Sequence, residues 1–326
     1  MSTHAIPVEK YHGTGNDFLV VDADARSVRD RAEFARAYCD RETGVDPEAF
    51  GSETGDYRRG ADGVLFVSIE KRYRPTRIVM TLVQPDGSTA AMCGNGARVV
   101  ARWAHDRTGD REFMIDTQAG TRRATVSADG SEATIEMGVP AFAPRDVPVS
   151  RDDPLIEEPI EGLTVSAVNT GVPHAVAFVG RGVDESNDTA GTGDVTKGLD
   201  AVDLDQVAPP VRYADAFPDG ANVNVAAIVD PGSAENEASG LPVIDQRTYE
   251  RGVEGETQSC GTGAVAIAAV AVRLGLIDGD TVVVRPPGGE LTITVPNDDQ
   301  ATLTGPVAHE FSGQVASDPQ MKGTHR

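Results

Sequence analysis

The chain has 326 residues, and its 51 acidic and 29 basic side chains give a formal net charge of −22, which excludes a basic nucleic-acid-binding surface. Only four of the basic residues are lysines, and we interpret this acidic, lysine-poor balance as a halophile-like surface adapted to concentrated salt. The length suffices for one large or two medium domains. The longest apolar run, 264–272, is far shorter than a membrane span of roughly 20 residues, and residues 1–10 lack a signal-peptide core. We therefore expect a cytoplasmic protein with no membrane partner.

The first half of the chain predicts strands on both sides of one long helix. Helical spacing of apolar residues marks 30–40, and a second helix begins after Cys93 and stops near Gly109. The segment 46–59, rich in glycine and acidic residues, predicts a surface insertion. The expected strands are two within 6–23 around a polar turn at 12–17, then 64–69, 77–83, 113–116, 124–126 and 134–137.

The second half repeats this order. A helix follows Cys260 and ends near Gly275, and its all-apolar run 264–272 predicts protein on every side. Two polar stretches, 184–196 and 230–240, have the composition of solvated insertions. The expected strands are 163–168, 175–179, 222–229, 242–249, 282–285, 291–295 and 301–303. Many short strands with one buried helix in each half predict an α+β protein with an internal duplication.

A cysteine stands at the glycine-rich turn before each of the two main helices, at Cys93 and at Cys260. The unpaired N–H groups and positive dipole of a helix start favour the thiolate, the reactive form of the side chain. The glycines beside them expose backbone N–H groups that suit a carboxylate: Gly94, Gly96, Gly261 and Gly263. One such turn alone is equally consistent with simple packing. Two copies at corresponding places in a duplicated chain favour function.

The remaining cysteine and the competing motifs point elsewhere. Cys39, in a helix without glycines, is expected to be a small buried apolar residue, and three cysteines favour free thiols over a disulfide framework. The spacing Gly261-x-Gly263-x-x-Ala266 matches a dinucleotide fingerprint, but residues 250–259 are too polar for the buried strand it requires. The three cysteines and six histidines have no paired zinc-ligand spacing, and neither a phosphate-binding loop nor a pyridoxal-phosphate lysine is evident.

Two stretches resemble the signatures of diaminopimelate epimerases: Cys93-Gly-Asn-Gly-Ala-Arg98, and Tyr249-Glu-Arg-Gly252 followed by Gly255-Glu-Thr-Gln-Ser-Cys-Gly-Thr-Gly-Ala264. Shorter matches run along the whole chain in the same order, apart from the insertion at 46–59. They are His12-Gly-Thr-Gly-Asn-Asp-Phe18, Gly60-Ala-Asp-Gly-Val-Leu65, Pro85-Asp-Gly-Ser88, Pro173-His174, Gly220-Ala-Asn-Val223, Pro287-Gly-Gly289 and Leu303-Thr-Gly-Pro306.

The resemblance implies a fold and a reaction. The fold is α+β with two pseudo-symmetric halves, 1–137 plus 306–326 and 138–305, each a curved, mostly antiparallel sheet around a central helix. The site is expected in the cleft between the halves. The reaction is the epimerisation of LL-diaminopimelate to the meso form in lysine biosynthesis, without pyridoxal phosphate, metal or any other cofactor. Inverting an α-carbon needs a base on one face and an acid on the other. A thiolate and a thiol would fill these roles.

The same resemblance assigns roles to individual residues. Cys93 and Cys260 are the expected catalytic bases, and His174 and Glu250 are candidates to hold or move their protons. Arg251 would pair with a substrate carboxylate. For His174 alone a structural role is the more usual one, and Asn16 is equally readable as a turn residue. The other expected substrate contacts are the backbone N–H groups of Gly94, Asn95, Gly261 and Thr262 and the side chains of Asn16, Asn222, Glu250 and Gln84.

Two positions depart from the family pattern. Gln84 and Val172 stand where asparagines that contact substrate are usual; Gln84 keeps the hydrogen-bonding group, and Val172 does not. These changes affect distal specificity and leave the reaction type untouched. A racemase of another amino acid is therefore a second interpretation, and a thiol redox or binding protein using both cysteines is a third. The sequence does not determine the oligomeric state, so a homodimer is open, nor which cysteine rests as the thiolate.

Overall fold

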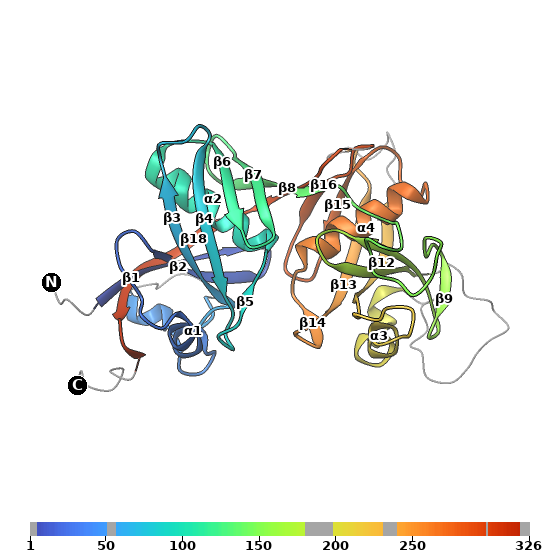
Figure 1. The fold of residues 1–326 in the computed structure, drawn as a ribbon, viewed down its shortest axis with the longest axis horizontal. Helices are drawn as coiled ribbons and strands as arrows, with labels where there is room; N and C mark the ends of the chain where they lie inside the picture. The colour runs from blue at the N-terminus through green and yellow to red at the C-terminus, as the bar shows by residue number, and fades with distance from the viewer. Residues whose placement is uncertain (1–4, 51–56, 180–197, 231–239, 298, 320–326) are drawn as a thin grey trace. The chain divides into compact units, whose positions relative to one another are not determined.

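The computed structural model describes residues 5–50, 57–179, 198–230, 240–297 and 299–319 (Figure 1). The chain divides into two compact units, Met1–Ile135 with Gly305–Arg326 (unit 1) and Glu136–Thr304 (unit 2). The chain enters unit 2 within strand β8 (Glu132–Gly138) and returns to unit 1 within β17 (Ala301–Pro306). In the described parts of the chain, no helix is long and apolar enough to cross a membrane.

Unit 1 has a sheet with a helix on each face. Helix α2 (Gly94–Thr108) contacts β1, β2, β3, β4, β6 and β7, whereas α1 (Arg31–Cys39) packs with an apolar cluster on the other face. A short 3₁₀ helix, η1, covers Pro47–Phe50. Besides β8, the strands of this unit are β1 (Ala5–Gly13), β2 (Asn16–Asp22), β3 (Gly63–Glu70), β4 (Thr76–Val83), β5 (Thr89–Ala90), β6 (Glu112–Thr117), β7 (Gly120–Val126) and β18 (Ala308–Ala316).

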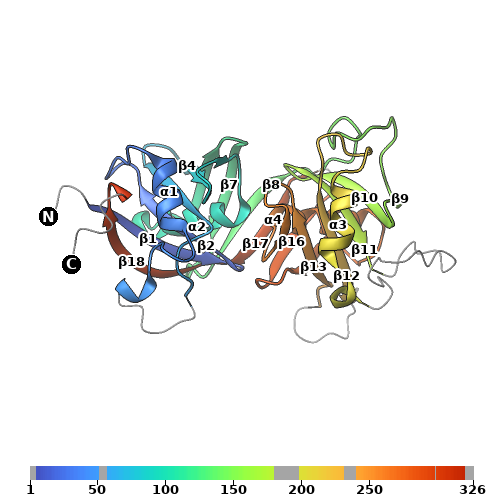
Figure 2. The same cartoon turned by 90° about the horizontal axis from the view of Figure 1, so that it is seen from below.

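Unit 2 is built in the same way. Helix α4 (Gly261–Arg273) contacts β10, β11, β12, β13, β15 and β16, and α3 (Leu204–Arg212) packs against β12 and β13 (Figure 2). A short 3₁₀ helix, η2, covers Leu199–Ala201. Besides β17, the strands are β9 (Glu158–Ile160), β10 (Leu163–Asn169), β11 (Pro173–Phe178), β12 (Asn222–Asp230), β13 (Val243–Glu250), β14 (Gly255–Thr257), β15 (Thr281–Arg285) and β16 (Leu291–Thr294).

The two units share one strand topology. In unit 1, β1 and β2 pair antiparallel, β2 and β3 parallel, β3 and β4 antiparallel, and β4 and β6 parallel. In unit 2 the series β10, β11, β12, β13 and β15 repeats this alternation in the same order. The predicted fold class, α+β with two similar halves, is confirmed, and the repeated pairing allows residues of the two units to be matched position by position.

The buried helix predicted after Cys260 is also confirmed. Residues 263–271 of α4 are all buried, and the helix is apolar on every side because the curved sheet wraps around it. Helix α2 is more amphipathic, and it is capped after Thr108 by Gly109, whose left-handed φ of 72° lets its N–H bond back to the carbonyl of His105. The strands expected from alternation are present, most with bounds shifted by one or two residues. The strand expected at 124–126 begins four residues earlier, at Gly120, and the one expected at 301–303 ends three residues later, at Pro306.

Helix α3 and the segment near residue 50 differ from expectation. Pro209 and Pro210 lie inside α3, so its sequence argues against a helix, but Asp203 caps its first turn and its apolar face is buried. The insertion expected at 46–59 is only partly superficial: the ring of Phe50 stacks on that of Phe311, with centroids 5.3 Å apart. Residues 51–56, the whole of 184–196 and all but the ends of 230–240 lie outside the described residues.

Candidate active site

Cys93 is the N-cap residue of α2, as predicted. Its backbone is extended, with φ −143°, and its Sγ accepts the N–H of Gly96 at 3.4 Å. The side chain is only half-buried. The first N–H groups of a helix have no partner within the helix, so the turn after Cys93 presents donors toward the thiol side of α2. This arrangement stabilises negative charge near the helix start.

Cys260 occupies the corresponding place before α4. It is 6% exposed, and its Sγ lies 3.5 Å from the hydroxyl of Thr262. Gly263 is required here because a Cβ at that position would lie 2.5 Å from Asn224 Oδ1 and 3.2 Å from Cys260 Sγ. The helix N-terminus therefore packs directly on the side chains of the sheet beneath it. Both helix starts predicted at the cysteines are confirmed.

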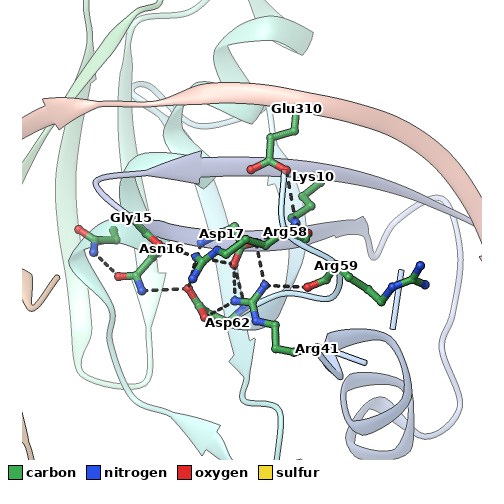
Figure 3. A network of polar contacts seen from close by, with 10 residues as sticks. Lys10, Gly15, Asn16, Asp17, Arg41, Arg58, Arg59, Asp62 and Glu310 are labelled. Atoms are coloured by element: carbon green, nitrogen blue, oxygen red, sulfur yellow. Dashed lines mark hydrogen bonds and ion pairs between the residues drawn. The ribbon is translucent and has the colours of Figure 1, made fainter. Parts of the chain in front are cut away.

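A chain of side-chain hydrogen bonds runs through unit 1 beside Cys93. Arg98, fully buried, donates to Asn95 Oδ1 at 2.6 Å, and Asn95 Nδ2 donates to Asn16 Oδ1 at 2.5 Å. Asn16 Nδ2 in turn donates to Asp62 Oδ2 at 3.0 Å (Figure 3). Arg98 also donates to the carbonyl of Pro306. The two asparagines assigned from the resemblance are thus brought together, and each is held in a single amide orientation.

This series of hydrogen bonds ends at Asp62 in a cluster of charged side chains, which Figure 3 shows. Arg41 pairs with both Asp62 and Asp17, and Lys10, with no exposed side-chain surface, pairs with Asp17 at 2.7 Å and with Glu310 at 3.3 Å. Burial opposes ionisation of Asp17, but its bonds with Arg41 and Lys10 outweigh burial and hold its pKa below the usual value. Burial raises the pKa of Glu310 despite Lys10. The ionised Asp17 is therefore the anchor of the cluster.

Gln84, the residue that departs from the family pattern in unit 1, follows the end of β4. Its Oε1 accepts the hydroxyl of Ser88 at 2.8 Å, and its backbone N–H bonds to the carbonyl of the same residue. The turn 85–87 was predicted, and the bond from the Gly87 N–H to the Gln84 carbonyl confirms it. The side chain of Gln84 is thus oriented by its own turn.

In unit 2, three adjacent strand ends carry the residues assigned from the resemblance. His174 and Asn222 are cross-strand partners at the starts of β11 and β12, and Arg251 follows the end of β13 beside them. Asn222 Oδ1 accepts the backbone N–H of Arg251 at 2.7 Å, and its Nδ2 donates to the carbonyl of Pro173 at 3.4 Å. The Arg251 guanidinium donates to the carbonyl of Asp219 at 3.1 Å. Asn222 therefore links all three strand ends.

His174 is completely buried. Burial, reinforced by the positive charge of Arg251, lowers the pKa of His174 to about 3, although a hydrogen bond with Asn224 acts in the opposite direction. The ring is consequently neutral at physiological pH. A neutral imidazole can donate one hydrogen bond and accept another, and it does not rest as a proton reservoir.

Glu250, at the end of β13, is the second candidate for proton transfer. Burial raises the pKa of Glu250, and a hydrogen bond of 3.0 Å from the Thr257 hydroxyl to its Oε2 opposes this only in part. Raising a carboxyl pKa brings it closer to neutrality, where an acid–base group is most effective. Thr257 is positioned by strand β14, which pairs with β13.

The sequence analysis missed several side chains that support these groups. Asn224, Thr248 and Gln246 form a buried polar cluster under Cys260, and Arg98 and Asp62 anchor the asparagines of unit 1. Period-2 alternation places the first three on one face of neighbouring strands, and polar residues inside otherwise apolar strands are the signal that could have identified them.

The remaining cysteine and the loop at Val172 complete the picture. Cys39 is 1% exposed in the core of unit 1, where burial raises its pKa to about 12, so its predicted packing role is confirmed. Two residues before Val172, the hydroxyl of Thr170 donates to the carbonyl of Thr262 at 2.8 Å and so contacts the first turn of α4. In the described part of the chain, no three His, Cys, Asp or Glu side chains gather as metal ligands would.

Known proteins of one family resemble the chain over almost its whole length. The sequence profile of the family described as diaminopimelate epimerase matches residues 8–143 and 166–310. A protein named diaminopimelate epimerase from Methanothrix thermoacetophila is 38% identical over 316 residues, which cover 95% of this chain and 95% of that protein. One of the same name from Methanocella arvoryzae is 37% identical, covering 96% of this chain and 98% of that one.

Solved structures share the fold at much lower identity. A phenazine biosynthesis protein from Bacillus anthracis aligns with a TM-score of 0.59 and 15% identity over 97% of this chain and 99% of its own. A hydroxyproline epimerase from Agrobacterium vitis, solved with trans-4-hydroxy-L-proline, aligns with a TM-score of 0.53 and 18% identity over 97% of this chain and 92% of its own. At these identities the likeness shows the fold alone.

Proposed function

Because the chain belongs to the diaminopimelate epimerase family, we propose that it converts LL-diaminopimelate to the meso isomer on the route to lysine. The observation that carries the proposal is the pair of cysteines, each the N-cap of the central helix in one of two topologically equivalent units. We further propose that the enzyme acts in the cytoplasm and that its halves are residues 1–137 plus 306–326 and 138–305.

The proposed reaction moves one proton off and one proton onto the same α-carbon. A thiolate removes the α-proton from one face, and the thiol of the other cysteine delivers its proton to the opposite face. At the end of the turnover the first cysteine is the thiol and the second is the thiolate, so the charge and the proton count balance. The reverse reaction exchanges the roles of Cys93 and Cys260, and no redox step is needed.

Stabilisation of the carbanion is proposed to come from the two helix starts. Charge that develops at the α-carbon spreads into the adjacent carboxylate, where fixed backbone donors lower its energy. The N–H groups proposed for this are those of Gly94, Asn95, Gly261 and Thr262, in the first turns of α2 and α4. Arg251 is proposed to pair with a substrate carboxylate, with Asn222 holding its backbone. Pyridoxal phosphate and metal ions are not needed for this scheme.

Hydrogen exchange tests the proposal directly. Purified protein incubated with LL-diaminopimelate in D₂O, without added cofactor, should incorporate deuterium at the α-carbon as the meso isomer accumulates. Mass spectrometry follows the deuterium, and chiral chromatography follows the isomer. The experiment is run over a range of salt concentrations because the acidic surface suits concentrated salt. No exchange at any salt concentration would reject the proposal.

A second candidate function is racemisation of another amino acid by the same two cysteines. Val172 motivates it, because valine cannot supply the hydrogen bonds of the asparagine usual at that place. A panel of amino acids assayed by α-deuterium exchange distinguishes the two functions. A protein that uses Cys93 and Cys260 only as a redox pair would exchange deuterium into no member of the panel.

A further inference from the structure

A buried row of polar side chains lies beneath Cys260 and reaches His174. Gln246 Nε2 donates to the carbonyl of Cys260 at 3.2 Å and to Thr248 Oγ1 at 2.8 Å. Thr248 donates to Asn224 Oδ1 at 2.9 Å, and Asn224 Nδ2 faces His174 Nδ1 at 3.0 Å. All four side chains are at most 2% exposed. Because each of these buried side chains bonds to the next, the row has one self-consistent direction.

Backbone carbonyls determine that direction. A carbonyl oxygen only accepts hydrogen bonds, so the Gln246 group facing the Cys260 carbonyl is its NH₂. Thr248 then accepts from Gln246 and donates onward to Asn224 Oδ1. At the other end, Asn224 Nδ2 also donates to the carbonyl of Ala175 at 3.3 Å, which independently fixes the same amide orientation.

The orientation of Asn224 determines the tautomer of His174. Because the amide NH₂ of Asn224 faces Nδ1, that ring nitrogen must be the acceptor, and the proton of the neutral ring is on Nε2. Nε2 is buried and has no hydrogen-bond partner among the residues that the structure describes. The ring therefore holds an unused donor, which is costly inside a protein unless a ligand or another group of the reaction completes it.

The internal duplication shows that the fold does not require this polar row. Strand register matches Asn224 with Leu65, Thr248 with Leu82 and Gln246 with Met80, all buried in unit 1. The position equivalent to His174 is Phe18, which pairs with the first residue of β3 as His174 pairs with the first residue of β12. The polar row therefore occurs in unit 2, where the ring is that of His174, and the equivalent positions are apolar in unit 1, where the ring is that of Phe18.

We propose that Asn224, oriented by Thr248 and Gln246, is a positioning residue that keeps His174 in the Nε2–H tautomer, so that His174 acts as a hydrogen-bond donor to an anion of the reaction and not as a general base. The activity part of this inference rests on the proposed function; the tautomer part does not. The anion is either a substrate carboxylate or a cysteine thiolate, and both have the acceptor chemistry that a lone buried N–H needs.

The tautomer is tested by NMR on protein labelled with ¹⁵N-histidine, without substrate. Long-range ¹H–¹⁵N correlations distinguish Nδ1–H from Nε2–H, and loss of one signal set in His174→Gln assigns the ring. The wild type should show a bare Nδ1 and a protonated Nε2 throughout the pH range in which an ordinary histidine titrates. Asn224→Asp, which has the same shape, should move the ring proton to Nδ1, because a carboxylate at residue 224 accepts a hydrogen bond from Nδ1–H. An Nδ1–H tautomer in the wild type overturns the inference.

A unit-1-like variant separates tautomer control from packing. In the triple variant Asn224→Leu, Thr248→Leu, Gln246→Met the row copies the apolar residues of unit 1, and replacing a buried polar network by apolar groups is often neutral for stability. We expect an unchanged melting temperature, a mixed His174 tautomer and a kcat about 100-fold lower. Gln300→Glu is the control for Asn224→Asp, because it adds the same negative charge to unit 2 at an exposed position. Full activity in the triple variant would contradict the inference.

Substitution of the ring itself separates a donor from a base. Glutamine places an NH₂ near the position of Nε2 and does not titrate, whereas asparagine does not reach that position. His174→Gln should therefore retain at least about tenfold more activity than His174→Asn. A rise in KM would identify the substrate carboxylate as the acceptor, and a shift in the pH dependence of cysteine alkylation would identify a thiolate. An equal loss of activity in His174→Gln and His174→Asn would contradict the role of His174 as a donor. Wild-type protein that has the expected His174 tautomer but does not turn over diaminopimelate would reject the proposed epimerase activity and leave the tautomer inference standing.

Discussion

Asn95 donates its side-chain amide to Asn16 at 2.5 Å, and this bond joins the first turn of α2 to the first residue of β2. Asn16 donates on to Asp62, whose charge is held by Arg41. The side-chain orientation of Asn16, an expected substrate contact, is thus determined by the ion pair of Asp62 with Arg41.

Asp62→Asn should weaken catalysis through Asn16. The substitution removes the anionic acceptor of Asn16 Nδ2 and leaves Arg41 with one partner fewer, so the amide of Asn16 can rotate. We expect kcat/KM to fall about tenfold, which is the loss of one hydrogen bond to a charged group. Steady-state kinetics measure it. Asp116→Asn, the same change at the half-exposed pair with Arg77, is the control and should keep normal activity; equal losses in both would refute the role of Asp62.

Cys93→Ala and Cys260→Ala should each abolish epimerisation. Each variant removes one of the two proton-transfer groups, and the loss of such a group costs about 10²- to 10⁴-fold in rate. Circular dichroism should show an intact fold, since both residues precede helices that are held by their own packing. Cys39→Ala is the matched control: it should lose only stability, about 1 kcal/mol. Near-normal two-way turnover in either site variant would exclude a two-base mechanism.

Glu250 should give the fold and the activity a pH dependence. Its pKa is raised in the folded protein by burial, so the folded state favours the protonated form. That contribution to stability is fully present below the unfolded pKa and is lost as the pH rises through the folded pKa. Glu250→Gln should therefore be more stable than the wild type at neutral pH, with the difference vanishing in acid, and it should lower kcat. Denaturant titrations at several pH values measure the stability, and a difference that grows toward acid would be contrary to this assignment.

Gly263→Ala should disturb catalysis more than Gly96→Ala. A Cβ at residue 263 would approach Asn224 Oδ1 to 2.5 Å and Gln246 Nε2 to 2.9 Å, whereas at residue 96 the nearest atom, a Leu65 methyl, is 3.3 Å away. The first substitution must displace the N-terminus of α4, and a displacement near 1 Å reduces turnover by about 10²-fold. Kinetics and melting temperatures of the two variants provide the comparison. A larger loss for Gly96→Ala would show that the close packing under Cys260 is unimportant.

The sequence alone determined the fold class and the places of the cysteines. Alternating strands, the all-apolar run 264–272 and the glycine-rich turns each report local periodicity and backbone freedom, which do not depend on distant contacts. The resemblance to the family added roles for residues such as His174. Those roles were assigned because the family's motifs occur in this chain in the same order. Helix α3 escaped prediction because burial of its apolar face overrides the unfavourable prolines at 209 and 210.

Only the tertiary structure decided which side chains support the proposed site. Asp62 and Asn16 are 46 positions apart, and Asn224 and His174 are 50 positions apart, yet each pair shares a hydrogen bond because parallel strand pairing brings distant segments into register. Burial, which the sequence does not state for a polar residue, makes His174 neutral and gives the amide of Asn224 one orientation. The positions of the two cysteines could therefore be predicted from the sequence, whereas the side chains that orient their neighbours could be identified only from the tertiary structure.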